Sequence, residues 1–178
     1  MIEQSSGLFI FAATVANFIQ DRTASNPRRQ LKIMLTTAYV ASSATSPHRH
    51  LDALYLTVLR EAFPKIGEDD WQRANLRVVL GSIVLLFDPL DPECLDVLLE
   101  LDESTSRSTL QQLHSIAIVP NAGDGPVRLI HPSEHDFLID GVRCGDVNFV
   151  VDARTRMRSL LSGVCEHCRA VPGYMQDR

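Results

Sequence analysis

The sequence predicts a mainly α-helical protein, in which a helical bundle is followed by a winged-helix domain with a small β-hairpin. Apolar residues recur at spacings of three and four through most of residues 1–114, which is typical of helices that bury one face. Residues 115–120 and 126–131 are short β-type runs, and the Asn121-Ala-Gly-Asp-Gly between them has the turn chemistry of a hairpin. Three helices followed by a hairpin is the order of a winged helix, in which the hairpin packs back on the helices.

The first third of the chain predicts three amphipathic helices, over residues 5–21, 28–40 and 51–62. In each of them apolar residues return every three or four positions and line one helix face for burial. Asn26-Pro27 separates the first helix from the second, and the Ser- and Thr-rich residues 41–50 predict a loop before the third. The third helix carries the clearest apolar stripe: Leu51, Leu54, Tyr55, Val58, Leu59 and Ala62.

Acidic residues mark the start of the next two helices. Asp69 and Asp70 suit a helix N-terminus, where carboxylates meet exposed amides and the positive end of the helix dipole. The helix that follows extends to Phe87 and is apolar almost all round, so we expect it at the centre of the core. Asp91-Pro92 predicts an N-cap and a first-turn proline for a short helix, and a further helix is expected over residues 104–114.

After the hairpin, the sequence predicts a short helix over residues 136–140, a loop over 141–146 and a last helix over 152–168. No internal repeat is visible. The expected domains are a helical domain at 1–66, a winged-helix domain at 67–146, and a C-terminal helix that starts a following helical region at 147–178.

Composition and charge exclude several classes of function. Seventeen Lys and Arg against 22 Asp and Glu give a formal net charge of −5, whereas proteins that bind nucleic acid by neutralising phosphates are usually basic. Four unevenly spaced cysteines do not make a disulfide scaffold, which indicates a reducing compartment and a cytoplasmic location. The apolar stretch at 7–19 lacks the basic start of a signal peptide, and the one at 76–87 is shorter than the roughly 20 residues of a spanning helix. We therefore expect no membrane association.

Two motifs resemble metal sites. His131-Pro-Ser-Glu-His135 matches the H-x-x-E-H string of one class of zinc protease. A proline directly after a strand and the lack of a well-placed third ligand favour a helix start instead, where Ser133 or Glu134 caps the helix and His131 closes the strand. Cys165-Glu-His-Cys168 is a single CxxC pair within a helical pattern, which favours packing over zinc binding.

No motif of a catalytic site is present in the sequence. It contains no G-x-x-x-x-G-K-[ST], G-x-G-x-x-G or G-x-S-x-G string, and its serines cluster without a well-placed His and Asp pair. The residues therefore predict an interaction role and no enzyme activity.

Several short sequence segments, spread along nearly the whole chain, follow one another in a definite order. They are Ser6-Gly-Leu-Phe-Ile-Phe-Ala-Ala-Thr14, Leu51-Asp-Ala-Leu-Tyr55, Val79-Leu-Gly-Ser-Ile-Val-Leu-Leu86 followed by Pro89-Leu90, Pro126-Val-Arg-Leu-Ile-His-Pro-Ser133, and Asp136-Phe-Leu138 with Arg143-Cys144. In this order they resemble fungal NACHT-domain NTPases of the STAND class. The resemblance is to the part that follows the nucleotide-binding core: a helical domain, the winged-helix domain and the start of the next helical region.

The resemblance implies a non-catalytic regulatory role, as the lid of a nucleotide-dependent signalling switch. In that class a histidine near the end of the lid meets the β-phosphate of ADP in the resting state, and His131 stands at this position, with Glu134 where phenylalanine is usual. Phe9 stands where related proteins carry a proline near the adenine, and it is a weaker candidate for that contact.

The partner that the resemblance implies is the nucleotide-binding NACHT core, in the same chain or in another. No cofactor is expected for the chain alone, and ADP or ATP is expected only together with that core. Without the core, the apolar residues 7–11 and the surface around His131 are expected to be uncovered, which predicts self-association.

Two alternatives of other classes remain. The helix-hairpin order also fits a winged-helix module that binds nucleic acid. The helix that would contact DNA, at 104–114, offers only Arg107 as a cation, which is few for phosphate contacts. A metallohydrolase that uses His131 and His135 would require stoichiometric zinc.

Overall fold

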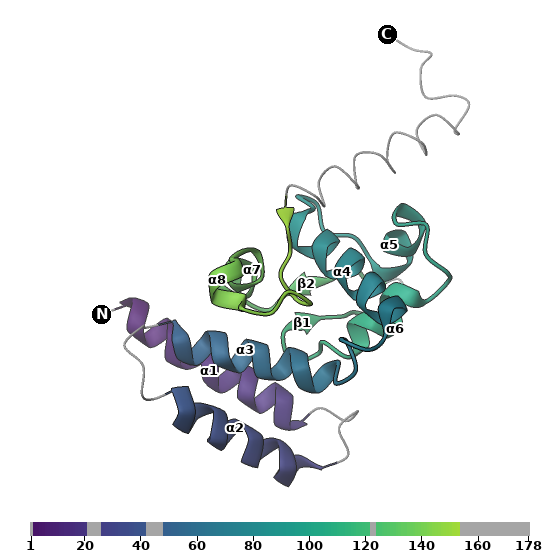
Figure 1. Cartoon of the computed structure of the whole chain (residues 1–178). Coiled ribbons are helices and arrows are strands. Elements are labelled where there is room, and N and C mark those ends of the chain that lie inside the picture. Colours follow the sequence, from purple (N-terminus) through teal and green to yellow (C-terminus); the bar gives the residue numbers. More distant parts are fainter. Residues whose placement is uncertain (1, 21–25, 42–47, 122–123, 154–178) are drawn as a thin grey trace, which may run out of the picture.

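The computed structural model describes residues 2–20, 26–41, 48–121 and 124–153, and of residues 2–8 and 38–41 it describes the backbone alone. These ranges form eight α-helices and one two-stranded antiparallel sheet, so the protein is mainly helical with a small sheet, as the sequence predicts (Figure 1). The predicted last helix over 152–168, including Cys165 and Cys168, lies almost entirely outside the described residues.

Three helices begin the fold: α1 (Ile2–Gln20), α2 (Pro27–Ala41) and α3 (Arg49–Ala62). They pack against one another along one side of the molecule (Figure 1). The predicted stripe of α3 is confirmed, because its five buried residues are Leu51, Leu54, Tyr55, Val58 and Leu59. The helix begins two residues before the predicted start, and residues 42–47 of the predicted loop lie outside the described residues.

Aspartates cap the next two helices, as predicted. Asp69 precedes α4 (Asp70–Leu85) and accepts a hydrogen bond from the Gln72 amide at 2.9 Å. Asp91 precedes α5 (Pro92–Leu98) and accepts from the Cys94 amide at 2.7 Å. The third helix of this group is α6 (Thr105–Gln111), shorter than predicted at both ends.

The hairpin consists of β1 (Ala117–Ile118) and β2 (Arg128–Leu129), with Ala117 opposite Leu129. Strand β2 lies beside both α4 and the helix that follows the hairpin. One further hydrogen bond, from the Val127 amide to the Leu90 carbonyl at 2.9 Å, ties the approach to β2 to the connection between α4 and α5. The hairpin is thus attached to the helices that precede it.

Two expectations after the hairpin are wrong. Helix α7 (Pro132–Ile139) begins four residues before the predicted 136–140, and a short helix α8 (Gly141–Cys144) stands where a loop was expected. The reason is capping in both cases. The His131 side chain caps α7, and Asp140 caps α8 by accepting from the amides of Val142 and Arg143.

A single hydrophobic cluster extends through the described residues. It includes Leu54 and Leu59 of α3 together with Leu76 and Leu80 of α4 and Phe137 of α7, each of which is at most 1% exposed. The boundary between residues 66 and 67 stays a prediction, and the core is continuous across it. In the part of the chain that the structure describes, no helix has both the length and the apolar character needed to span a membrane.

Candidate functional site

His131 occupies the junction between β2 and α7. Its backbone is extended (φ −145°, ψ 146°), and its Nδ1 atom accepts a hydrogen bond from the Ser133 amide at 3.1 Å. An imidazole nitrogen thus performs the capping role that a Ser or Asp oxygen usually performs. The expectation that Ser133 or Glu134 caps the helix while His131 closes the strand is therefore corrected: His131 is the N-cap, and Glu134 completes the cap from inside the helix.

Glu134 is turned toward the backbone and is 1% exposed. Its Oε2 atom accepts from the amides of Ile130 at 3.0 Å and His131 at 3.2 Å, which makes a reciprocal capping box with His131. Its Oε1 atom is buried and has no hydrogen-bond partner among the described residues. Desolvation raises the pKa of the Glu134 carboxyl to about 8, against the opposing effect of the two amide donors. A carboxyl that is largely neutral at pH 7 does not repel an anion near His131.

Tyr55 connects α3 to this helix start. Its hydroxyl lies 2.7 Å from Ser133 Oγ, and Ser133 Oγ lies 2.8 Å from His131 Nδ1. The Tyr55 ring packs on Phe137 with a centroid separation of 5.5 Å and an interplanar angle of 53°. Burial is the main cause that raises the pKa of Tyr55 to about 12, so its hydroxyl keeps its proton at neutral pH. We call Tyr55, His131, Ser133 and Glu134 the His131 cluster.

A second polar contact between α3 and the C-terminal helices, an ion pair, lies one helical turn away from Tyr55. Arg143 donates from Nη2 to Asp52 Oδ1 at 2.7 Å and from Nε to the same oxygen at 3.2 Å. Only 21% of the Arg143 side chain and 13% of the Asp52 side chain are exposed. The hydrogen bond to Asp52 is the main cause that raises the pKa of Arg143. This pair fixes the position of α8 on α3.

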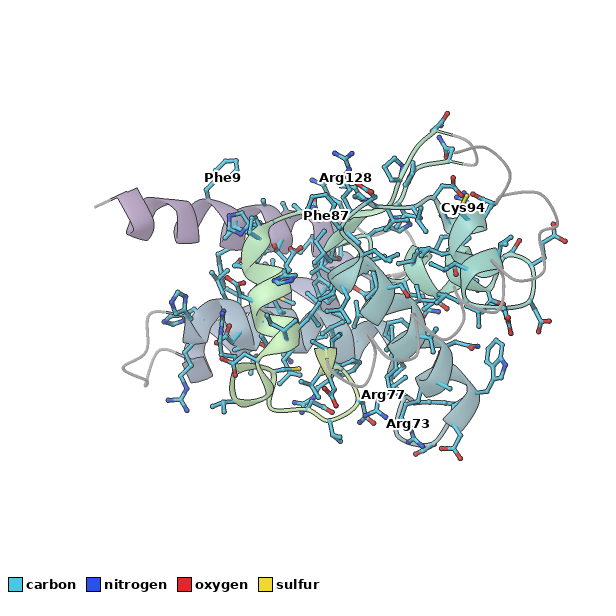
Figure 2. All side chains as sticks on the ribbon, turned by 90° about the horizontal axis from the view of Figure 1, so that it is seen from above. Phe9, Arg73, Arg77, Phe87, Cys94 and Arg128 are labelled. Carbon is cyan, nitrogen blue, oxygen red and sulfur yellow. The ribbon has the colours of Figure 1, made fainter. Side chains whose placement is uncertain are left out.

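Phe9 takes no part in the His131 cluster. Its side chain is 79% exposed and points from α1 away from the rest of the molecule (Figure 2). Its neighbour Ile10 is buried at 3%, so only part of the predicted apolar stretch is uncovered. Among the described residues, the ring contact that the structure shows is that of Tyr55 with Phe137 and does not include Phe9.

The hydrogen bonds of His131 define its chemistry. Because Nδ1 accepts from a backbone amide, it holds a lone pair, and the proton of the neutral ring is on Nε2. Nε2 has no hydrogen-bond partner within the described residues, so its N–H is available to an acceptor such as an anionic oxygen. The amides of Ser133 and Glu134 bond to His131 itself, so an acceptor at this position would meet the imidazole instead of those two amides.

The two histidines of the H-x-x-E-H string make contacts within the protein. His131 Nδ1 is occupied by the cap, and His135 Nδ1 lies 3.3 Å from Asp136 Oδ1. Across the described ranges there is no group of three or more His, Cys, Asp or Glu side chains that could hold a metal ion. The CxxC pair at 165–168 lies outside those ranges.

A cavity of about 550 Å³ lies elsewhere, where the ends of α1 and α3 meet the starts of α2 and α4. Its lining includes Phe18, Gln30 and Glu61 but neither His131 nor Phe9. Gln30 is 2% exposed, and neither atom of its side-chain amide has a hydrogen-bond partner in the described structure. We call this cavity the Gln30 pocket.

Sequence reasoning placed Tyr55 in an apolar stripe and missed that it bonds to Ser133. Asp52 and Tyr55 are three residues apart on one helix face, which indicates a shared neighbour. Their partners stand 91 and 78 residues further along, and no local pattern identifies them. No family model, no curated protein and no solved structure matches this chain.

Proposed function

We propose that the chain is the non-catalytic regulatory lid portion of a NACHT-type STAND signalling NTPase. It would dock on a nucleotide-binding core, help to hold ADP there and control the opening of the switch. The nucleotide belongs to the complex with the core, because the chain carries no phosphate-gripping loop of its own.

The observation that carries the proposal is the convergence of three separate strings at one place. Asp52 and Tyr55 belong to the string at 51–55, Ser133 ends the string at 126–133, and Arg143 belongs to the last. In the structure Tyr55 bonds Ser133 and Asp52 bonds Arg143. Strings far apart in the sequence therefore form one contact between the helical part and the part that contains His131, where a lid and its support would meet.

The arrangement around the hairpin supports a winged helix. Three helices, α4 to α6, precede the hairpin, β2 lies beside α4, and the Val127 amide bonds to Leu90 between the first two of these helices. Arg107 is engaged within the protein, because it bonds Glu93 at 2.6 Å and the Pro120 carbonyl at 2.8 Å. The cation on which the nucleic-acid alternative depends is thus tied to a carboxylate.

His131 is the residue that we propose for the phosphate contact. A neutral imidazole with its proton on Nε2 donates to a phosphate oxygen without needing a positive charge. The buried carboxyl of Glu134 is held by backbone amides and does not compete for that donor. Phe9, at 79% exposure, is free to pack on an adenine ring that a docked core presents.

The test joins the chain in frame behind the nucleotide-binding core of a fungal STAND protein and measures the rate of ADP release. His131→Ala is expected to accelerate release by about tenfold, as the loss of one hydrogen bond to a charged group implies. His135→Ala, four residues further along the same helix, is the matched control and should leave the rate unchanged. Equal rates for the wild type and His131→Ala would refute the phosphate role.

A further inference from the structure

The His131 cluster contains a chain of hydrogen bonds with a definite direction. The Ser133 amide donates to His131 Nδ1 at 3.1 Å, so this nitrogen carries no proton. The short contact of 2.8 Å between Ser133 Oγ and the same nitrogen is then a bond in which the hydroxyl donates. With its one proton used, Ser133 Oγ can only accept from the Tyr55 hydroxyl, 2.7 Å away.

The direction of this chain decides which atom of His131 is a donor. Two donors converge on Nδ1, one from the backbone and one from the Ser133 hydroxyl. Donation by Tyr55 to Ser133 Oγ polarises that hydroxyl and makes it a stronger donor to the ring. Every bond in the chain therefore favours the ring form that has its proton on Nε2.

We propose that Tyr55 is a positioning residue for His131: acting through Ser133, it strengthens the preference of the imidazole for the Nε2–H form that the cap sets, and it does so only while α3 stays packed on α7. The inference rests on the proposed function in one respect, namely that the acceptor of this N–H is a phosphate oxygen. The Tyr55–Ser133 hydrogen bond then joins α3 to α7 and also strengthens donation to His131 Nδ1. Separating α3 from α7 therefore weakens the preference of the ring for the Nε2–H form.

The surroundings allow the hydroxyl of Tyr55 to be tested apart from its ring. The ring is held by Phe137, and the neighbouring Asp52–Arg143 pair keeps α3 on α8 without Tyr55. Tyr55→Phe therefore removes one hydroxyl and leaves the packing. Thr57→Val is the matched control, since it removes a hydroxyl from α3 that bonds Ala53 and Thr37 but not Ser133.

The experiment is a two-bond ¹H–¹⁵N correlation spectrum of the imidazole nitrogens in the full chain at neutral pH, with the His131 signals assigned from His131→Gln. In the wild type, we expect His131 to carry its proton on Nε2. In Tyr55→Phe, the Ser133 hydroxyl loses the donor that polarises it, so the fraction of rings with the proton on Nδ1 should rise by up to about twofold. Thr57→Val should match the wild type.

Ser133 provides the second part of the test. Ser133→Ala removes the donor to the ring itself and should give a larger rise, about threefold to tenfold. Tyr55→Phe should add nothing to it in the double variant, and Ser133→Thr should keep the wild-type spectrum. A wild-type ring with its proton on Nδ1, or a Tyr55→Phe spectrum identical to the wild type in a folded protein, would overturn the inference. Unchanged ADP release in His131→Ala would refute the proposed function and leave this result standing.

Discussion

Helix α3 has two sides, and buried polar groups are accommodated differently on each. Toward α7 and α8, Tyr55 bonds Ser133 and Asp52 bonds Arg143. Toward α1 and α2, the hydroxyl of Thr14 and the side-chain amide of Gln30 are buried without a hydrogen-bond partner in the described part of the chain. The first side is held by a largely buried ion pair and the Tyr55–Ser133 bond. On the second, the directional contacts are the Thr37–Thr57 hydrogen bond at 3.3 Å and the more exposed Glu61–Arg29 pair, beside apolar packing at the Gln30 pocket.

The difference between the two sides of α3 determines how strictly each contact fixes the orientation of the packed helices. A buried polar group without a partner costs stability, and a buried polar group with one adds little net stability but restricts geometry. The contact of α3 with α7 and α8 is therefore fixed in orientation, as a site that must place an imidazole requires. The contact with α1 and α2 is less constrained, because its ion pair is more exposed, and we expect substitutions there to be better tolerated.

Phe137→Ala should have the largest effect on stability. The ring is 1% exposed and packs on Tyr55, so its removal leaves a cavity and should lower the free energy of unfolding by about 3–5 kcal/mol. Phe18→Ala, on the other side, should cost less than this, because Phe18 borders the Gln30 pocket and part of its ring already faces empty space. Urea unfolding followed by circular dichroism measures both. Equal losses would show that the two sides are packed alike.

The pH dependence of stability tests the buried carboxyl of Glu134. Its pKa is raised from the ordinary value of 4.5 to about 8, so between these values the folded protein binds more protons than the unfolded chain. Stability should therefore fall as pH rises from about 4.5 to about 8, by at most about 1.4 kcal/mol per pH unit from this group. Below about pH 4.5 the Glu134 carboxyl does not change stability with pH, because it is protonated in both the folded and the unfolded protein.

Glu134→Gln should remove this part of the pH dependence. The amide oxygen can still accept from the Ile130 and His131 amides, so the capping box is kept. Glu103→Gln, at an exposed position, should leave the slope of the wild type unchanged. If the unfolding free energies of wild type and Glu134→Gln ran parallel between pH 5 and 8, the carboxyl would be ionised in the folded protein.

Two of the ion pairs of α3 should differ in strength. Asp52–Arg143 is mostly buried, and double-mutant cycles with Asp52→Asn and Arg143→Gln should give a coupling of about 1–2 kcal/mol. Glu61–Arg29 joins α3 to α2 with 64% of the Arg29 side chain exposed, and its coupling should be below about 0.5 kcal/mol. Addition of 0.5 M salt should reduce the second coupling more than the first. Couplings of similar size would remove this part of the contrast.

Thr14→Val should have a small effect on stability, of the opposite sign. The hydroxyl is fully buried without a partner, so an apolar side chain of the same shape should raise the unfolding free energy by about 1 kcal/mol. Ser133→Ala, which breaks the chain from Tyr55 to His131, should lower it by a similar amount. Thermal unfolding of both variants gives the comparison, and a loss of stability in Thr14→Val would show that this hydroxyl has a partner.

The sequence predicts the helices of this fold better than its contacts. The stripe of α3 and the aspartate caps of α4 and α5 follow from local spacing, and the structure confirms them. The predicted start of α7 was wrong because histidine is not among the usual capping residues, although Glu134 at the third helical position is typical of a capping box.

The candidate site shows the same limit. The resemblance identifies His131, but the apolar spacing of α3 predicts Tyr55 only as a core residue, because a phenol in a periodic pattern is indistinguishable from an apolar ring. Its bond to Ser133 depends on the packing of α3 against α7. The pKa of Glu134 was equally inaccessible, because it depends on a burial that only the folded chain creates.

The long sequence separations of the α3 contacts have a consequence for the order of folding. Tyr55 and Ser133 are 78 residues apart and Asp52 and Arg143 are 91 apart, whereas α1, α2 and α3 pack as neighbours in sequence. Closing the longer loops costs more chain entropy, so these bonds should form after the rate-limiting step of folding. Substitutions at Tyr55 or Arg143 should therefore accelerate unfolding far more than they slow refolding, and the lifetime of the native state depends on this contact.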